Sequence, residues 1–176
     1  MATAFLIDGY NLIHAMTSLG KRVGPGVLEK ARLRLLSLLH HSLGNQSASV
    51  TVVFDAAGAP AGSTSKHVVE EMKIYFALKG QQADDVIEEL IQHDAAPKQL
   101  TVVSNDHRLQ QAARRRKAKV MSCEAFVDML GRLRRRQAAA VAGPEKKEKE
   151  TPEEASRLLE EFGDLDEDLG DINLRF

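Results

Sequence analysis

The sequence predicts an α/β protein with a mostly parallel central sheet. Short apolar runs alternate along the chain with longer segments of helical spacing, and this alternation is typical of a parallel sheet covered by helices. Three of the runs, residues 5–7, 50–54 and 100–103, are apolar almost throughout, as strands buried on both faces are. The chain has 176 residues, of which 43% are hydrophobic, so we expect one domain with a substantial core.

The first third of the chain predicts two strands with a helix between them. Residues 3–11 begin as a buried strand and end in an Asp-Gly turn. Residues 27–43 place apolar side chains at helical spacing and basic side chains on the other face. These apolar positions are Leu28, Ala31, Leu35, Leu38 and Leu39. Residues 49–56 are rich in β-branched side chains and predict the second strand.

The middle of the chain predicts a loop, a strand and a helix. Residues 58–65 are rich in Gly, Pro and Ser, which predicts a mobile loop. Residues 67–72 are expected to begin a short helix, and residues 72–78 alternate as a third strand does. Residues 82–95 predict a helix with acidic residues in its first turn, where the helix dipole favours negative charge.

Two more strands and two more helices are expected before residue 143. Residues 99–106 predict the fourth strand, residues 107–118 a helix, and residues 119–121 a short fifth strand. Ser122 is placed to cap the N-terminus of a final helix over residues 123–140. Each predicted strand is therefore followed by a helix or a loop that can return the chain to the start of the next strand.

The charge of the chain divides it into two parts, although its net value is only −1. Residues 144–176 carry 12 acidic and 5 basic side chains, whereas residues 1–143 carry 13 acidic and 19 basic ones. We therefore expect a domain at 1–143 and, at 144–176, a charged linker with an acidic tail that is partly helical or disordered. Such a tail either competes mildly with an anionic partner of the domain or acts as a solubilising, partner-binding extension.

Several classes of protein are excluded by what the sequence lacks. No stretch approaches the roughly 18 apolar residues that a membrane span needs, and the basic segment of a signal peptide is missing. Cys123 is the only cysteine, so neither an internal disulfide nor a Cys-rich zinc site can form. A Gly-rich dinucleotide motif and a P-loop are also missing. We expect a cytoplasmic protein without a disulfide framework.

Acidic residues stand at the ends of the predicted strands. Asp8, Asp55 and Asp106 each end a strand, and Asp84 opens the helix after the third strand, with Asp85 beside it. Because ligands of parallel sheets bind at the carboxyl ends of the strands, we expect these side chains to converge. Carboxylates without nearby His or Cys suit Mg²⁺ or Mn²⁺, ions that serve phosphodiester hydrolysis. We predict a metal site of Asp8, Asp55, Asp84 and Asp106, with Asp85 as an additional candidate.

Polar side chains accompany these carboxylates. Asn11 offers an amide and Ser104 a hydroxyl, and each could orient a metal-bound water or a phosphate. Taken singly, each residue also has a structural alternative, because Asp, Asn and Ser are common in turns and at helix N-termini. Tyr10 could either stack on a base or pack in the core. The predicted catalytic residues are Asp8, Asn11, Asp84, Ser104 and Asp106.

Four segments carry a resemblance to a known family. They are LIDGYNLI at residues 6–13, VVFDA at 52–56, KGQQADDVIEELI at 79–91 and VVSNDHRLQ at 102–110, and they cover about residues 3–130. In these segments the sequence resembles the NYN-domain proteins of the YacP-like group, within the PIN-like nuclease superfamily. The resemblance implies a PIN-like, Rossmannoid three-layer fold and a metal-dependent ribonuclease activity. It maps the acidic cluster onto Asp8, Asp55, Asp84 and Asp106, with Asn11 and Ser104 as supporting residues.

Basic residues gather in two runs of a single sign, at residues 114–119 and 132–136. Lys66, Lys73 and Lys79 flank the predicted loop and the third strand. Surfaces of this kind contact phosphates without reading bases, although a solvated helix face is the structural alternative. The predicted RNA-binding residues are Lys66, Lys79, Arg108, Arg114, Arg115, Arg116 and Lys117.

We expect a Mg²⁺- or Mn²⁺-dependent endoribonuclease that cleaves RNA, either free or in the context of the ribosome. Two other classes stay open. A non-catalytic RNA- or ribosome-binding module would use the same basic faces without cleavage. A phosphatase would use Asp8 as a covalent nucleophile, although Tyr10 stands where such enzymes carry a second aspartate.

Overall fold

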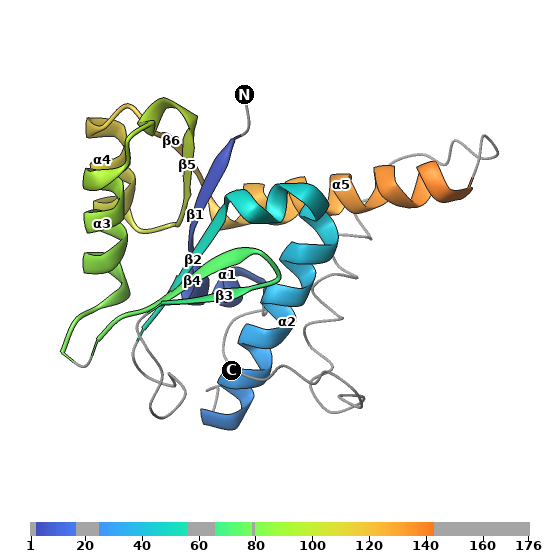
Figure 1. The fold of residues 1–176 in the computed structure, drawn as a ribbon, viewed down its shortest axis with the longest axis horizontal. Helices are drawn as coiled ribbons and strands as arrows, with labels where there is room; N and C mark the ends of the chain where they lie inside the picture. Colours follow the sequence, from blue (N-terminus) through green and yellow to red (C-terminus); the bar gives the residue numbers. More distant parts are fainter. Residues whose placement is uncertain (1–2, 17–24, 56–65, 79, 143–176) are drawn as a thin grey trace.

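The computed structural model describes residues 3–16, 25–55, 66–78 and 80–142, which form a single six-stranded sheet with helices on both faces (Figure 1). The order of the strands is β3-β4-β2-β1-β5-β6. All neighbouring strands are parallel except β3 and β4. The strands are β1 (Ala4–Asp8), β2 (Val50–Phe54), β3 (Lys66–Val69), β4 (Met72–Phe76), β5 (Leu100–Val103) and β6 (Lys119–Met121). The mostly parallel sheet predicted from the sequence is confirmed.

The helices form one layer on each face of the sheet (Figure 1). One layer contains α1 (Gly9–Met16), α2 (Pro25–Leu43) and α5 (Cys123–Ala142), which contact one another, and the other contains α3 (Ala83–His93) and α4 (His107–Arg115). Successive side chains of β1 point to opposite faces, so Phe5 and Ile7 pack in the first core and Leu6 in the second. Two 3₁₀ turns, η1 (Gly44–Ser49) and η2 (Pro97–Gln99), lead into β2 and β5.

The expected helix over residues 67–72 is wrong, because this segment forms β3 and the turn into β4. Val69 pairs with Met72, and Glu70 and Glu71 between them both have positive φ, at 47° and 67°. Positive φ at both central residues is the geometry of a two-residue turn that matches the twist of antiparallel strands. The acidic pair suggested a helix start, but pairing with β4 decides the conformation. The turn expected after the first strand is the start of helix α1, which spans Gly9–Met16.

The predicted cap of the last helix is confirmed, because the hydroxyl of Ser122 accepts a hydrogen bond from the backbone N–H of Ala125 at 3.2 Å. Three expectations lie outside the described residues: the loop at 58–65, Lys79, and the linker and tail at 144–176. In the described part of the chain, no helix is long and apolar enough to cross a membrane.

The parallel strands bring the ends of distant segments to one edge of the sheet. β1, β2, β4 and β5 lie side by side, and they end at Asp8, Phe54, Phe76 and Val103. Gly9 follows β1 directly, and a Cβ atom at this position would overlap the ring of Phe54. The missing side chain of Gly9 therefore lets the chain turn into α1 tightly against β2, immediately after Asp8.

Candidate active site

Asp8 lies at the centre of the carboxyl edge and is 7% exposed. Its Oδ1 accepts a hydrogen bond from the backbone N–H of Asn11 at 3.1 Å, and its Oδ2 accepts one from the hydroxyl of Ser104 at 3.3 Å. The amide Nδ2 of Asn11 also donates to the Ser104 hydroxyl at 3.3 Å. The structure thus brings together three of the predicted catalytic residues.

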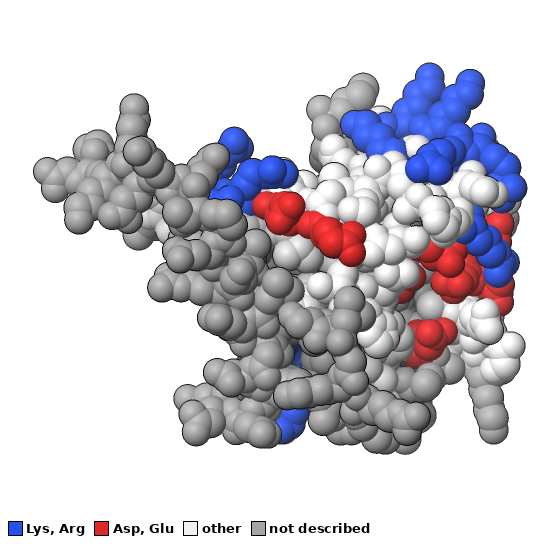
Figure 2. All heavy atoms as spheres, turned by 180° about the vertical axis from the view of Figure 1, so that it is seen from behind, with Lys and Arg blue, Asp and Glu red and all other residues white. Residues whose placement is uncertain are grey.

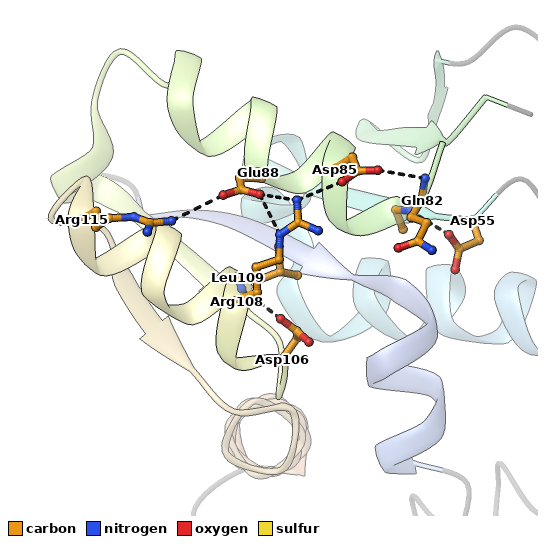
Figure 3. A network of polar contacts seen from close by, with 9 residues as sticks. Asp55, Gln82, Asp85, Glu88, Asp106, Arg108, Leu109 and Arg115 are labelled. Carbon is orange, nitrogen blue, oxygen red and sulfur yellow. Dashed lines mark hydrogen bonds and ion pairs between the residues drawn. The ribbon is translucent and has the colours of Figure 1, made fainter. Parts of the chain in front are cut away.

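Ser104 connects Asp8 with the fourth strand end. It is fully buried, and its hydroxyl oxygen accepts a hydrogen bond from the backbone N–H of Asp106 at 3.0 Å. Asp106 caps helix α4, because its Oδ1 accepts a hydrogen bond from the backbone N–H of Leu109 at 3.0 Å (Figure 3). Asp106 therefore has a structural role as a helix cap, and Ser104 links the carboxylate of Asp8 to the backbone of Asp106.

Asp55 holds the start of helix α3. Its Oδ1 accepts a hydrogen bond from the backbone N–H of Ala83 at 2.7 Å, across a gap of 28 residues in the sequence. This contact fixes the first turn of α3 beside the end of β2, so Asp84 is brought to the same edge of the sheet. The N-cap residue Gln82 lies close to Asp55 (Figure 3).

Two of the four carboxylates, Asp8 and Asp84, have a raised pKa. Burial is the largest cause that raises the pKa of Asp8, to about 6, and the charge of Asp84 adds to it. Burial also raises the pKa of Asp84, followed by the charges of Asp106 and Asp55. Asp84 thus lies within electrostatic reach of all three other acids, and a raised pKa means that the anionic cluster is unfavourable without a cation.

The donor chemistry of the cluster fits a hard divalent cation. All four candidate ligands are carboxylates, the oxygen donors that Mg²⁺ and Mn²⁺ take. As the side chains stand, the described residues contain no group of three or more His, Cys, Asp or Glu residues placed to hold a metal ion. Hydrogen bonds to backbone N–H groups engage one oxygen of Asp55 and one of Asp106. Binding of a shared ion therefore requires these side chains to move toward one another.

Asp85 takes part in a different set of contacts (Figure 3). Its Oδ2 accepts a hydrogen bond from the backbone N–H of Gln82 at 3.4 Å, and its Oδ1 accepts one from Arg108 at 3.0 Å. Arg108 also pairs with Glu88 at 2.7 Å, and Arg115 reaches the other oxygen of Glu88 at 3.5 Å. This ion-pair network, made of Asp85, Glu88, Arg108 and Arg115, joins α3 to α4. Arg108, predicted to bind RNA, is paired with two carboxylates here.

The basic run at the end of α4 lies at the opposite edge of the sheet from the carboxylates. Helix α4 begins after Asp106 and ends at Arg115, and Lys119, which follows shortly, pairs with Thr101 near the start of β5. Figure 2 shows Lys and Arg gathered at the top of the molecule, above the acidic residues. Of the other predicted RNA contacts, Lys66 lies on β3, with its Nζ 5.5 Å from the ring centroid of Tyr75. We call the exposed residues Arg114, Arg115, Arg116, Lys117 and Lys119 the basic end of α4.

One residue of the site was not anticipated. Cys123, the first residue of α5, is buried, and its thiol donates to Oδ1 of Asn11 at 3.6 Å. Burial raises the pKa of this thiol to about 12, with further contributions from the charges of Asp8 and Glu124, so it stays protonated. The available signal was its position two residues after the predicted fifth strand, where a parallel strand ends at the same edge.

A parallel sheet with an acidic cluster at its carboxyl edge and helices on both faces is the architecture of a PIN-like nuclease domain. The chain belongs to the family with the YacP-like NYN domain, since the model of that family matches residues 5–165. This match extends past Gly143, and the domain boundary expected there stays a prediction.

Solved structures agree with this assignment. The crystal structure of Rae1 (YacP) from Bacillus subtilis is similar with a TM-score of 0.63 and 25% sequence identity, over 79% of each chain. A structure of a tryptophan-to-leucine mutant of that protein is similar with a TM-score of 0.62 and 26% identity, over 92% of this chain and 97% of the other. No curated protein matches this chain.

Proposed function

We propose that this protein is a Mg²⁺- or Mn²⁺-dependent endoribonuclease. The observation that carries the proposal is the electrostatic coupling of Asp84 to the three other acids at the carboxyl edge. A bound cation would stabilise a cluster in which neighbouring charges raise the pKa of Asp8 and Asp84, and membership of a nuclease family supports RNA hydrolysis as its use. The proposed metal ligands are Asp8, Asp55, Asp84 and Asp106.

The other residues of the site orient these carboxylates. Ser104 donates to Asp8 and accepts from Asp106, so it holds two proposed ligands in fixed positions. Asn11 donates to Asp8 through its backbone and to Ser104 through its side chain. When bound, the metal would activate water and neutralise charge at the phosphorus. The protein then has to hold the carboxylate oxygens in place and leave the carboxyl edge of the sheet accessible to the RNA backbone.

RNA is the proposed substrate, and the basic end of α4 is the proposed contact for a segment away from the cleaved bond. These side chains are exposed and lie at the edge opposite to the carboxylates. Exposed Lys and Arg residues bind phosphates without sequence preference. Action on RNA in the context of the ribosome is a further part of the proposal, because a large RNA partner can contact both edges.

Cleavage of an end-labelled RNA tests the proposed activity. We expect cleavage in Mg²⁺ or Mn²⁺ and none in EDTA, and a loss of at least two orders of magnitude in Asp84→Asn, because this residue is coupled to every other ligand. The matched control is Asp128→Asn, which removes the same charge from an exposed position on α5 and should cleave normally. Cleavage that persists in EDTA, or in Asp84→Asn, would contradict the metal site.

A non-catalytic RNA-binding module is the second candidate. It is favoured by the separation of the basic end of α4 from the carboxylates and by the lack of a preformed three-ligand group in the described residues. In that case RNA binds equally well with and without divalent metal, and no RNA is cleaved under any condition. The same cleavage and binding experiment therefore separates the two candidates.

A further inference from the structure

A group of aromatic side chains lies at the carboxyl edge of the sheet, next to the carboxylates. Phe54 is the last residue of β2 and Phe76 the last of β4, and their rings stack with centroids 5.8 Å apart. Tyr10, the second residue of α1, meets Phe54 edge-on with ring centroids 5.2 Å apart. The three rings thus form a continuous aromatic cluster that begins two residues after Asp8.

Arg32 from helix α2 covers this cluster and is only 5% exposed. Its guanidinium carbon lies 5.3 Å from the ring centroid of Phe76 and 6.0 Å from that of Phe54, the geometry of a cation–π contact. A side-chain hydrogen bond joins Arg32 to Tyr10, and the guanidinium is its donor because arginine has no acceptor. Arg32 therefore fixes the orientation of the Tyr10 phenol against the aromatic cluster.

Tyr10 is the member of this group that reaches the acidic site. Burial raises the pKa of Tyr10. The positive charge of Arg32 lowers this pKa, and the negative charge of Asp55 raises it. Tyr10 is half-buried and follows Asp8, the last residue of β1, by two positions, whereas Asp55 directly follows the end of β2 beside it. Since a Cβ atom at Gly9 would overlap Phe54, the aromatic cluster packs directly against the backbone between Asp8 and Tyr10.

The geometry points to Tyr10 as a substrate-binding residue that stacks on a nucleobase beside the phosphodiester at the carboxylates, and to Arg32 as the residue that positions Tyr10. This inference rests on the proposed function, because it takes RNA as the ligand of this edge. An aromatic ring offers a stacking face to every base, so the contact gives affinity with little sequence preference. A ring held by a buried arginine loses little conformational freedom when it binds.

Arg32 either positions Tyr10 for RNA binding or only packs in the core. A double-mutant cycle with Tyr10 distinguishes these two roles. Tyr10→Phe keeps the ring and removes the hydroxyl, whereas Arg32→Met keeps an apolar stem and removes the donor. If Arg32 positions Tyr10, each single change weakens RNA binding about threefold. The double variant then binds RNA no more weakly than either single variant, because both changes break the same contact. If Arg32 only packs the core, Arg32→Met lowers the free energy of unfolding and leaves the RNA affinity of the folded protein unchanged.

Fluorescence anisotropy of a labelled single-stranded oligoribonucleotide, measured in EDTA so that RNA stays intact, gives the affinities. Tyr10→Leu, which removes the ring, should weaken binding on the order of tenfold. Arg32→Lys keeps a donor and should restore most of the affinity lost in Arg32→Met. The matched control is Tyr75→Phe, because Tyr75 packs in the core on the other face of the sheet and should show unchanged affinity. Circular dichroism confirms that each variant is folded at the temperature of the assay.

Unchanged affinity in a folded Tyr10→Leu protein would overturn the inference, and so would additive losses in the double variant. Cleavage with Mg²⁺, measured in parallel, keeps this result apart from the proposed function. If the wild-type protein cleaves no RNA but Tyr10→Leu binds it more weakly, the proposed activity fails and the role of Tyr10 stands. If the wild-type protein cleaves and Tyr10→Leu keeps the same KM, the activity stands and the role of Tyr10 fails.

Discussion

Burial sets the ionisation of Asp8 before any ligand binds. Its pKa is raised to about 6, first by burial and then by the charge of Asp84, although hydrogen bonds from Asn11 and Ser104 oppose the shift. The folded, metal-free protein therefore holds a proton on Asp8 more tightly than the unfolded chain does. Between about pH 4 and pH 6, Asp8 is ionised in the unfolded chain but still protonated in the folded protein. The free energy of unfolding therefore falls as pH rises through this range, and the loss is complete above the folded-state pKa.

Asp8→Asn should consequently stabilise the metal-free protein at pH 7 while it abolishes cleavage. Asparagine has a similar shape but cannot ionise, so we expect the free energy of unfolding in EDTA to rise by roughly 2 kcal/mol at pH 7. The gain should shrink as pH falls from about 6 to about 4, because the wild-type carboxyl becomes protonated. Urea unfolding of both proteins across this pH range measures the effect. A variant that is equally destabilised at every pH would show that the hydrogen bonds of Asp8 outweigh its buried charge.

At the level of single residues, the positions of the carboxylates at the carboxyl ends of the strands could be predicted, but the side chains that contact them could not. Asp8, Asp84 and Asp106 could be predicted to converge because parallel strands end at a common edge. The contacts of Ser104 with Asp8 and of Cys123 with Asn11 span 96 and 112 residues, and no local pattern encodes them. The place of Arg32 was missed for a related reason, since an arginine within an amphipathic helix usually lies on the solvated face.

At the level of elements, the ion-pair network joins α3 to α4 alongside the apolar contacts between these helices. Arg108→Gln removes the central cation, and since the Arg108 side chain is 52% exposed and its partners 44% and 23%, we expect only a small decrease in the free energy of unfolding. Urea unfolding at low and at high salt measures it, and the difference between variant and wild type should vanish as salt screens the pairs. A loss that is large and independent of salt would mean that Arg108 acts through packing.

The end of α4 is the element that the proposed RNA contact depends on. Replacing Arg114, Arg115 and Arg116 by Ala should weaken RNA binding with little sequence bias and flatten the dependence of affinity on salt, because fewer counterions are released. Titrations of labelled RNA at several salt concentrations give the slope. The same triple change at 134–136 on α5 tests whether the other basic run contributes. An unchanged slope in the α4 variant would mean that this end is only a solvated surface.

Most elements could be predicted from periodicity, and β3 shows where that approach stops. Residues 66–69 carry no long alternating pattern, and the acidic pair that follows favours the first turn of a helix. The hairpin forms because Lys66 through Val69 pair with β4, which supplies hydrogen bonds that the segment cannot make alone. Helix α1 was hidden for a similar reason, because its eight residues directly follow a strand without a separating turn signal.

At the scale of the whole molecule, the two parts of the chain carry opposite net charge. Residues 144–176 have an excess of acids and residues 1–143 an excess of bases, so a chain that ends at Gly143 should bind RNA more tightly at low salt if the tail competes for the basic surface. The advantage should fade near physiological salt, where screening acts over about 8 Å. RNA titrations of both chains across a salt series measure it. Equal affinity at low salt would favour a solubilising or partner-binding tail.

The placement of the basic end of α4 bears on turnover. Helix α4 has nine residues, so it separates Asp106 from this end by about 14 Å. An intact RNA that contacts both edges is held by two linked interactions, and their combined strength exceeds that of either one. If RNA is cleaved at the carboxylates as proposed, the fragments no longer connect the two edges, and each is held by one weak contact. The proposed nuclease should therefore release its fragments more readily than its substrate, which would limit product inhibition.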